Sequence, residues 1–223
     1  MDKIFGYIIE LSRGLGTTLS LFALTIILSI PLGFVCSLGS LSKSKILRGI
    51  INVYVYIFRG TPLILQILFL FYGAGDLFKI PLLRGLGFSA PDRYLFALIS
   101  LIINYAAYFS EIFRGGIQSV PKGQYEASQV LGLTKKMTNN KIILPQVVKI
   151  VFPSVGNEVI NLVKDTALVS IIALKDIFVL TRSAVMRDAN YTPFLVAAVF
   201  YLIINFIATL VLRIGENKLS YYR

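Results

Sequence analysis

Polar and ionisable side chains recur at regular steps inside an apolar segment at 147–173. Ser154, Glu158, Asn161 and Asp165 are separated by four, three and four residues, so a helix places them on one face. An ionisable group at bilayer depth costs about 3 kcal/mol on insertion scales, and such groups therefore face a cavity or a partner. We expect Glu158 to accept an ammonium or another cationic group of a bound molecule, with Asn161 and Asp165 lining its path.

Two further polar side chains, Gln66 and Asn104, are weaker candidates for contact with the same molecule. Each stands in a different apolar segment from Glu158. A structural interpretation stays open beside this one. Lys164 and Asp165 would then pair within the helix or at the membrane interface, and the asparagines would hydrogen-bond between helices.

Three charged residues near the ends of other apolar segments are expected to be structural, with a gating role as the alternative for Glu111. Glu111 and Arg114 are three residues apart, a spacing at which a helix pairs opposite charges. Arg59 lies near one end of its segment, where it can reach the interface. The chain has no histidine and one cysteine, Cys36, so we expect no His/Cys metal site and no disulfide within the chain.

The elements that must position these side chains are long apolar blocks. Hydrophobic residues make up 56% of the chain and charged residues 15%, against about 25% charged in soluble domains. A helix of about 20 apolar residues crosses the hydrocarbon core, with its backbone amides bonded internally. We predict one all-α domain over 1–223, a polytopic membrane bundle of five transmembrane helices. Their expected spans are 15–39, 52–74, 93–113, 147–173 and 190–212.

The net charge of +11 lies in short loops between the apolar blocks. This placement argues against nucleic-acid binding and follows the positive-inside rule. Basic residues accumulate after the first span, at Lys43, Lys45 and Arg48, and again along 114–146. We therefore expect these two loops in the cytoplasm, the loops after the second and fourth spans outside, the N-terminus outside and the C-terminus inside. Residues 1–13 carry balanced charges, which is not typical of a cleaved signal.

The stretch 114–146 is patterned as two short helices around a sharp turn. Pro121 suits the first turn of a helix, and Gly132 suits its C-terminal end. Thr134 can cap a second helix that begins near Lys135. We predict that both helices lie at the membrane surface on the cytoplasmic side, either as a docking element or as an amphipathic segment that only rests on the membrane.

The same stretch resembles the signature loop of bacterial ATP-binding-cassette import permeases. Glu-Ala-Ser at 126–128 is followed after three residues by Gly132, after nine more by Ile142, and after one more by Leu-Pro at 144–145. The family pattern differs only in an alanine where Ser128 stands. In that family the loop forms coupling helices that dock on an ATPase subunit. The residues that the resemblance implies for this coupling are Glu126, Ala127, Ser128, Gly132 and Leu133.

Other stretches are similar to the polar amino acid branch of these permeases. They are Arg-Gly-Thr-Pro-Leu at 59–63, the segment 108–117, Gly-Asn-Glu at 156–158 and Lys-Asp-Thr-Ala-Leu at 164–168. The resemblance implies a permease subunit for uptake of a polar amino acid. Arginine, lysine or histidine is favoured because Asp165 adds a second acid, although glutamine would also offer an ammonium.

The sequence contains no Walker A pattern, so ATP and Mg²⁺ would bind a separate subunit and this chain would be no enzyme. The resemblance further implies a bacterial plasma membrane location with lipid contact. It implies an ATPase subunit, a second permease copy or homologue, and an extracellular or periplasmic solute-binding protein as partners. The rival interpretation is an ion- or proton-coupled secondary transporter that uses Glu158 and Asp165. A purely structural membrane scaffold is a third possibility.

Overall fold

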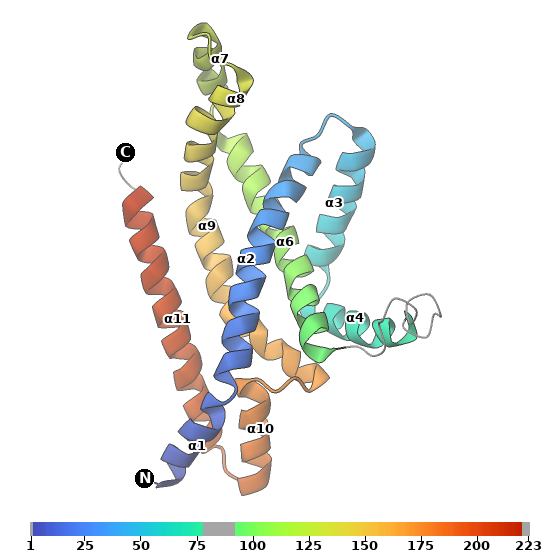
Figure 1. Ribbon diagram of the computed structural model, residues 1–223, viewed down its shortest axis with the longest axis vertical. Helices are drawn as coiled ribbons and strands as arrows, with labels where there is room; N and C mark the ends of the chain where they lie inside the picture. The colour runs from blue at the N-terminus through green and yellow to red at the C-terminus, as the bar shows by residue number, and fades with distance from the viewer. Residues whose placement is uncertain (1, 78–91, 220–223) are drawn as a thin grey trace.

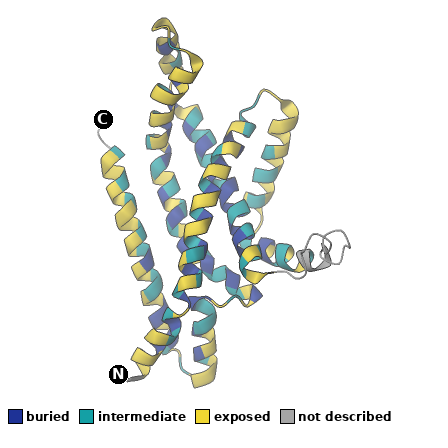
Figure 2. Ribbon diagram, viewed as in Figure 1, coloured by how far each residue is buried: buried dark blue, intermediate teal, exposed yellow. Residues whose placement is uncertain are grey.

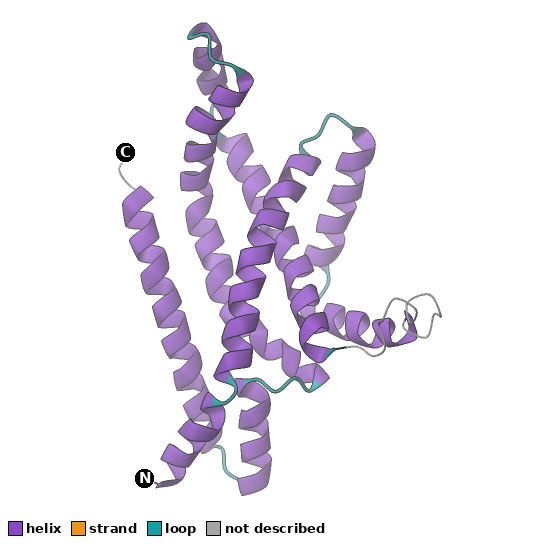
Figure 3. Ribbon diagram, viewed as in Figure 1, coloured by secondary structure: helices purple, strands orange, loops and turns teal. Residues whose placement is uncertain are grey.

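The computed structural model describes residues 2–77 and 92–219, and within these ranges every regular element is a helix (Figure 3). This confirms the predicted all-α class. The expected loop after the second span, with Lys79 and Arg84, lies outside the described residues. In chain order the elements are α1 Asp2–Ser12, α2 Leu15–Ser40, α3 Lys45–Gly60, α4 Leu63–Leu77, α6 Arg93–Ser119, α7 Lys122–Val130, α8 Lys135–Met137, the π-helix η1 Thr138–Ile143, α9 Leu144–Asp165, the 3-10 helix η2 Thr166–Ile172, α10 Ile177–Asp188 and α11 Thr192–Leu219.

Four stretches of the described chain are helical, long and apolar enough to cross a membrane, and the bent pair α3 and α4 would make a fifth. The first, third and fifth predicted spans coincide with α2, α6 and α11, and α6 and α11 extend further toward their C-terminal ends. The fourth predicted span, 147–173, is divided. Its α-helix α9 ends at Asp165, and η2 follows before Ala173 adopts a left-handed conformation with φ 54°.

The two ends of the bundle carry different short helices. In Figure 1, α7 and α8 project beyond the other helices at one end, and α11 runs toward that same end. The N-terminus, α1 and α10 lie at the opposite end. At this second end Tyr7 and Leu11 of α1 are buried in a cluster with Ile177 and Val196. The helix α1, Asp2–Ser12, therefore packs on α10 and α11.

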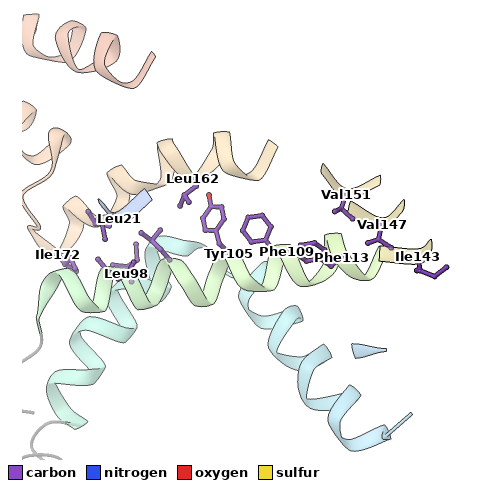
Figure 4. Packing of buried hydrophobic residues seen from close by; sticks show 14 of the residues in the cluster. Leu21, Leu98, Tyr105, Phe109, Phe113, Ile143, Val147, Val151, Leu162 and Ile172 are labelled. Carbon is purple, nitrogen blue, oxygen red and sulfur yellow. The ribbon is translucent and has the colours of Figure 1, made fainter. Parts of the chain in front are cut away.

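The core is organised around α6, which approaches α2 closely. A Cβ atom on Gly33 of α2 would lie 2.6 Å from the Cβ of Phe109 and 2.9 Å from the carbonyl oxygen of Ala106. Only glycine allows the two backbones this separation, as small residues do at membrane helix interfaces. Toward α9, three aromatic side chains of α6 meet a row of aliphatic ones (Figure 4). The labelled residues of these two rows are Tyr105, Phe109 and Phe113, and Val147, Val151 and Leu162.

Exposed residues run along the helices of the bundle (Figure 2), and many of them are large hydrophobic ones. In the described part of the chain, α3 buries no residue fully, and α11 buries few. The exposed side chains of α11 include Leu195, Leu202 and Phe206. Such continuous apolar exposure suits a helix whose surroundings are lipid and other membrane segments rather than water.

The predicted second span, 52–74, is not one straight helix. The chain bends by 108° between α3 and α4, at Thr61 and Pro62. Proline has no N–H to donate to the carbonyl four residues earlier, and its ring clashes with that carbonyl. The α-helix of α3 has 16 residues and is about 24 Å long, shorter than the hydrocarbon core of about 30 Å. This corrects the expectation of a continuous transmembrane helix there.

Candidate functional site

A cavity of about 660 Å³ opens where the bend between α3 and α4 meets α6 and α9. Three of the predicted ligand contacts on α9, Glu158, Asn161 and Asp165, line it together, and Asn104 lines it from α6. Ser154, the fourth member of the predicted α9 face, is exposed and is not part of the lining. The helical spacing of Glu158, Asn161 and Asp165 therefore places these three residues at one site.

The two acids in this cavity have different surroundings. The hydroxyl of Tyr105 on α6 donates a hydrogen bond to Asp165 Oδ2 at 2.7 Å, which ties α6 to the end of α9. Lys164 donates to Asn161 Oδ1 at 3.2 Å, one turn earlier on the same helix. The carboxylate of Asp165 is therefore held by the neutral hydroxyl of Tyr105. The carboxylate of Glu158 lines the same cavity and is half-buried. The site combines two carboxyl groups with polar donors, which suits a molecule carrying an ammonium group.

The bend beside the cavity is held by two amide side chains. Pro62 leaves the carbonyl of Phe58 without its usual helical donor. Both Gln66 Nε2 and Asn104 Nδ2 donate to that carbonyl oxygen at 3.0 Å. Gln66 Nε2 also donates to the carbonyl oxygen of Thr61 at 3.1 Å, and Gln66 Oε1 accepts from Asn104 at 2.9 Å.

These hydrogen bonds show that Gln66 and Asn104, the two weaker ligand candidates, have a structural role. An unsatisfied buried carbonyl costs about 1–3 kcal/mol, so the amide clamp of Gln66 and Asn104 stabilises the broken helix. Asn104 both belongs to this clamp and lines the cavity, whereas Gln66 stands behind the lining. The sequence analysis did not predict this clamp. The local pattern that could have indicated it is Pro62 followed four residues later by Gln66, whose amide can donate to the carbonyl left open by the proline.

A second cavity, of about 770 Å³, lies beside the first, toward the start of α3 and the end of α6. Glu111 accepts hydrogen bonds from Arg59, at 3.2 Å, and from Arg114, and Arg114 also donates to Gln118 at 2.7 Å. The predicted pairing of Glu111 with Arg114 is confirmed. Arg59 does not simply extend to the membrane interface, because it joins α3 to Glu111 on α6 and its guanidinium lies over the ring of Tyr108 at 5.4 Å.

The predicted helix, turn and helix of 114–146 are present at the projecting end of the bundle. Gly132 has φ +70°, the left-handed conformation that ends α7, and the Thr134 side chain accepts from the N–H of Met137 to cap α8. A six-residue π-helix, η1, then joins α8 to α9, which the sequence pattern did not indicate.

The residues predicted to dock on an ATPase differ in exposure. Glu126, Ala127 and Gly132 are exposed, Leu133 is intermediate, and Ser128 is buried with its hydroxyl bonded to the Gln124 carbonyl oxygen at 2.6 Å.

Two exposed apolar side chains beside this turn were missed. Val130 is 87% exposed and Leu131 is 75% exposed. Their position next to Gly132 at the tip of a predicted docking loop is the signal that would have identified them.

Comparison with known proteins places these features in a family. Residues 29–221 match the family described as binding-protein-dependent transport system inner membrane component. The chain is 34% identical, over 97% of its length and 99% of the relative, to a putative glutamine transport system permease protein GlnP of Rickettsia bellii. It is 35% identical to the arginine transport system permease protein ArtQ of Bacillus subtilis, over 93% of this chain and 91% of that one.

A solved structure agrees in fold. The crystal structure of an amino acid ABC transporter with histidines contains a chain that superposes with a TM-score of 0.83 at 29% identity, covering 97% of both chains. The signature-loop resemblance to ATP-binding-cassette import permeases is confirmed by these matches. The chain therefore belongs to the family of inner membrane components of binding-protein-dependent transport systems.

Proposed function

We propose that this chain is the membrane-spanning permease subunit of an ATP-driven importer for a polar amino acid. The observation that carries the proposal is the cavity in which Glu158 and Asp165 meet polar donors of α6, inside a chain of this transport family. Relatives whose names refer to glutamine and arginine transport support the same substrate class. Family membership favours this function over a secondary transporter that would use the same two acids as ion sites.

In this proposal Glu158 binds the α-ammonium or a cationic side chain of the amino acid. Asn161, Asp165 and Asn104 line the path beside it, and Gln66 acts on the path through the bend it supports. A second acid within one cavity favours arginine, lysine or histidine. Arg59 and Lys164 balance the charges of these two acids in the lining, which keeps glutamine among the candidates.

The tip formed by α7, Gly132 and α8 would dock on the ATPase subunit, which binds ATP and Mg²⁺. Glu126 and Ala127 offer an exposed polar and small surface, and Val130 and Leu131 offer an apolar one. Closure of two ATPase subunits would then move two permease copies as rigid bodies between inward-open and outward-open states. A second copy or a homologue completes the pathway, and an external solute-binding protein delivers the amino acid.

The orientation follows from the same assignment. The tip must lie in the cytoplasm to meet an ATPase, and α11 runs toward that end while α1 lies at the other (Figure 1). The N-terminus would therefore be outside and the C-terminus inside the plasma membrane. The basic residues Lys135, Lys136 and Lys141 on the tip agree with a cytoplasmic position.

The test is ligand binding by the purified complex of this chain with its ATPase. A thermal-shift screen against the twenty amino acids identifies the substrate class. Replacing Glu158 by Gln should weaken binding of the stabilising amino acid by about tenfold or more, because a charge-assisted bond to the ammonium is lost. Ser154→Ala is the matched control on the same helix outside the cavity. An unchanged affinity in Glu158→Gln would remove Glu158 from the site, and no stabilisation by any amino acid would overturn the proposed function.

A further inference from the structure

Arg59 occupies the place where the two cavities meet. It lines both the cavity that contains Glu158 and the cavity that contains Glu111 and Arg114. Among the described residues, the only other one common to both linings is its neighbour Gly60, which carries no side chain. The guanidinium of Arg59 is therefore the polar group that separates the two spaces.

The position of Arg59 is set by the broken helix. Arg59 lies in the last turn of α3, next to the bend that the clamp of Gln66 and Asn104 holds. Its guanidinium rests over the ring of Tyr108, which also lines the first cavity. A cation–π contact holds the guanidinium against the ring and leaves N–H groups available to bind an anion.

The present partner of Arg59 is Glu111, through a single contact at 3.2 Å between Nη1 and Oε2. Both side chains are partly exposed, at 40% and 27%, and Glu111 also binds Arg114. A guanidinium has five N–H donors, and a carboxylate fits it best through two parallel bonds. One contact to a shared acid leaves most of these donors available to a second carboxylate.

The lining of the first cavity contains charged groups of both signs. Glu158 and Asp165 supply anions for an ammonium, and Arg59 and Lys164 are the cations of the same lining. Lys164 is exposed and already donates to Asn161. A zwitterion bound with its ammonium at Glu158 needs a donor group for its carboxylate, and of these two cations Arg59 is the one with a planar, forked set of donors and an aromatic ring beneath it.

We propose that Arg59 is the carboxylate receptor of this cavity, and that a bound substrate carboxylate displaces Glu111 from it. This inference rests on the proposed amino acid transport. It assigns a specificity-determining role to Arg59 and a competing role to Glu111. Occupation of the first cavity would then loosen the contact that ties the end of α3 to α6, so substrate binding opens the barrier between the two cavities.

The test compares amino acids with their α-amides, which keep the ammonium and the side chain but lose the carboxylate charge. Dissociation constants are measured by thermal shift and calorimetry on the purified permease–ATPase complex, with each amino acid that stabilises the wild type and its amide. The wild type should bind the acid about tenfold or more tightly than the amide. Arg59→Gln should bring the two within about twofold by weakening only the acid. Arg59→Lys should give an intermediate ratio of the amide and acid dissociation constants, because lysine keeps the positive charge but lacks the paired N–H donors of a guanidinium.

Two further variants make the outcome specific. Glu111→Gln should tighten the acid a few-fold and leave the amide unchanged, because a competitor for Arg59 is lost. Ser154→Ala lies outside the first cavity, changes neither Arg59 nor Glu111 and should keep the wild-type ratio. A wild-type ratio in Arg59→Gln, or a ratio that falls in Lys164→Gln instead, overturns the inference while amino acid binding itself persists. Absence of binding by every amino acid would instead overturn the proposed function.

Discussion

The cavity beside the bend and the tip at the end of the bundle satisfy their side chains in opposite ways. Around the cavity, amides, acids and a tyrosine bind one another across three helices, as Gln66, Asn104 and Tyr105 do. At the tip, the hydrogen bonds of Ser128 and Thr134 stay within a few residues, a single long bond of 3.4 Å joins Gln124 to Gln146 of α9, and Val130 and Leu131 are largely exposed. A cavity whose polar lining is held in place by contacts between helices suits a small ligand, whereas exposed apolar side chains need a macromolecular partner to cover them.

The largest expected effect separates the two regions. Replacing Val130 and Leu131 together by Asp should abolish stable association with the ATPase subunit, because charges would enter an apolar contact without partners. Binding of the amino acid by the permease should be retained, since α7 and α8 project away from the helices that line the cavity (Figure 1). Co-purification of the two subunits measures the first property, and ligand-induced thermal shift of the permease measures the second.

The control for the tip is Leu131→Met, which keeps an apolar side chain of similar volume. It should preserve the complex. If the double Asp variant still co-purified with the ATPase at wild-type yield, the tip would not be the docking surface, and the contrast with the cavity would fail.

A smaller effect is expected from the amide clamp. Asn104→Ala removes donors to Phe58 and Gln66 and should destabilise the protein by about 1–3 kcal/mol, because buried acceptors lose their partner. Gln66→Ala should cost a similar amount, and the double variant should cost less than the sum, because the residues share one network. Denaturation of the detergent-solubilised protein measures these changes, with the exposed Asn157→Ala on α9 as control.

If the stability loss of the double variant equalled the sum of the losses of Asn104→Ala and Gln66→Ala, the two amides would act independently. Such a result would remove the shared network on which the description of the bend depends. A loss of ligand affinity in Asn104→Ala without loss of stability would instead identify Asn104 chiefly as a ligand contact, as its residue type and position in the sequence suggest.

The smallest effect is expected at Ser128. Its hydroxyl bonds to a carbonyl of its own helix, so Ser128→Ala should change stability by no more than about 0.5 kcal/mol and leave ATPase association unchanged. Ser128→Leu should disturb the tip, because the side chain is only 3% exposed. A marked loss of ATP-driven uptake in Ser128→Ala would show that the serine hydroxyl contacts the partner directly.

The same contrast explains what could be predicted from the sequence. The tip is built from local signals, so Gly132 and Thr134 are enough to predict its turn and its cap from the order of residues alone. The apolar blocks likewise locate α2, α6, α9 and α11.

The residues of the cavity required contacts between distant segments. Glu158, Asn161 and Asp165 were found because they share one helix. The contact of Arg59 with Glu111 was not predicted because the two residues are 52 positions apart in the sequence. The bend at Pro62 was missed because a proline in a membrane helix often only kinks it, and the outcome depends on donors such as Asn104 from elsewhere.

The bend also has a genetic consequence. A proline codon becomes an alanine codon through one base change, and alanine at position 62 would return an N–H to the Phe58 carbonyl. Residues on both sides could then continue as one helix, and Gln66 and Asn104 would lose the carbonyl that they share. A paralogue that lost this proline would keep its tip and the acids of α9 but lose the bend that closes one side of the cavity.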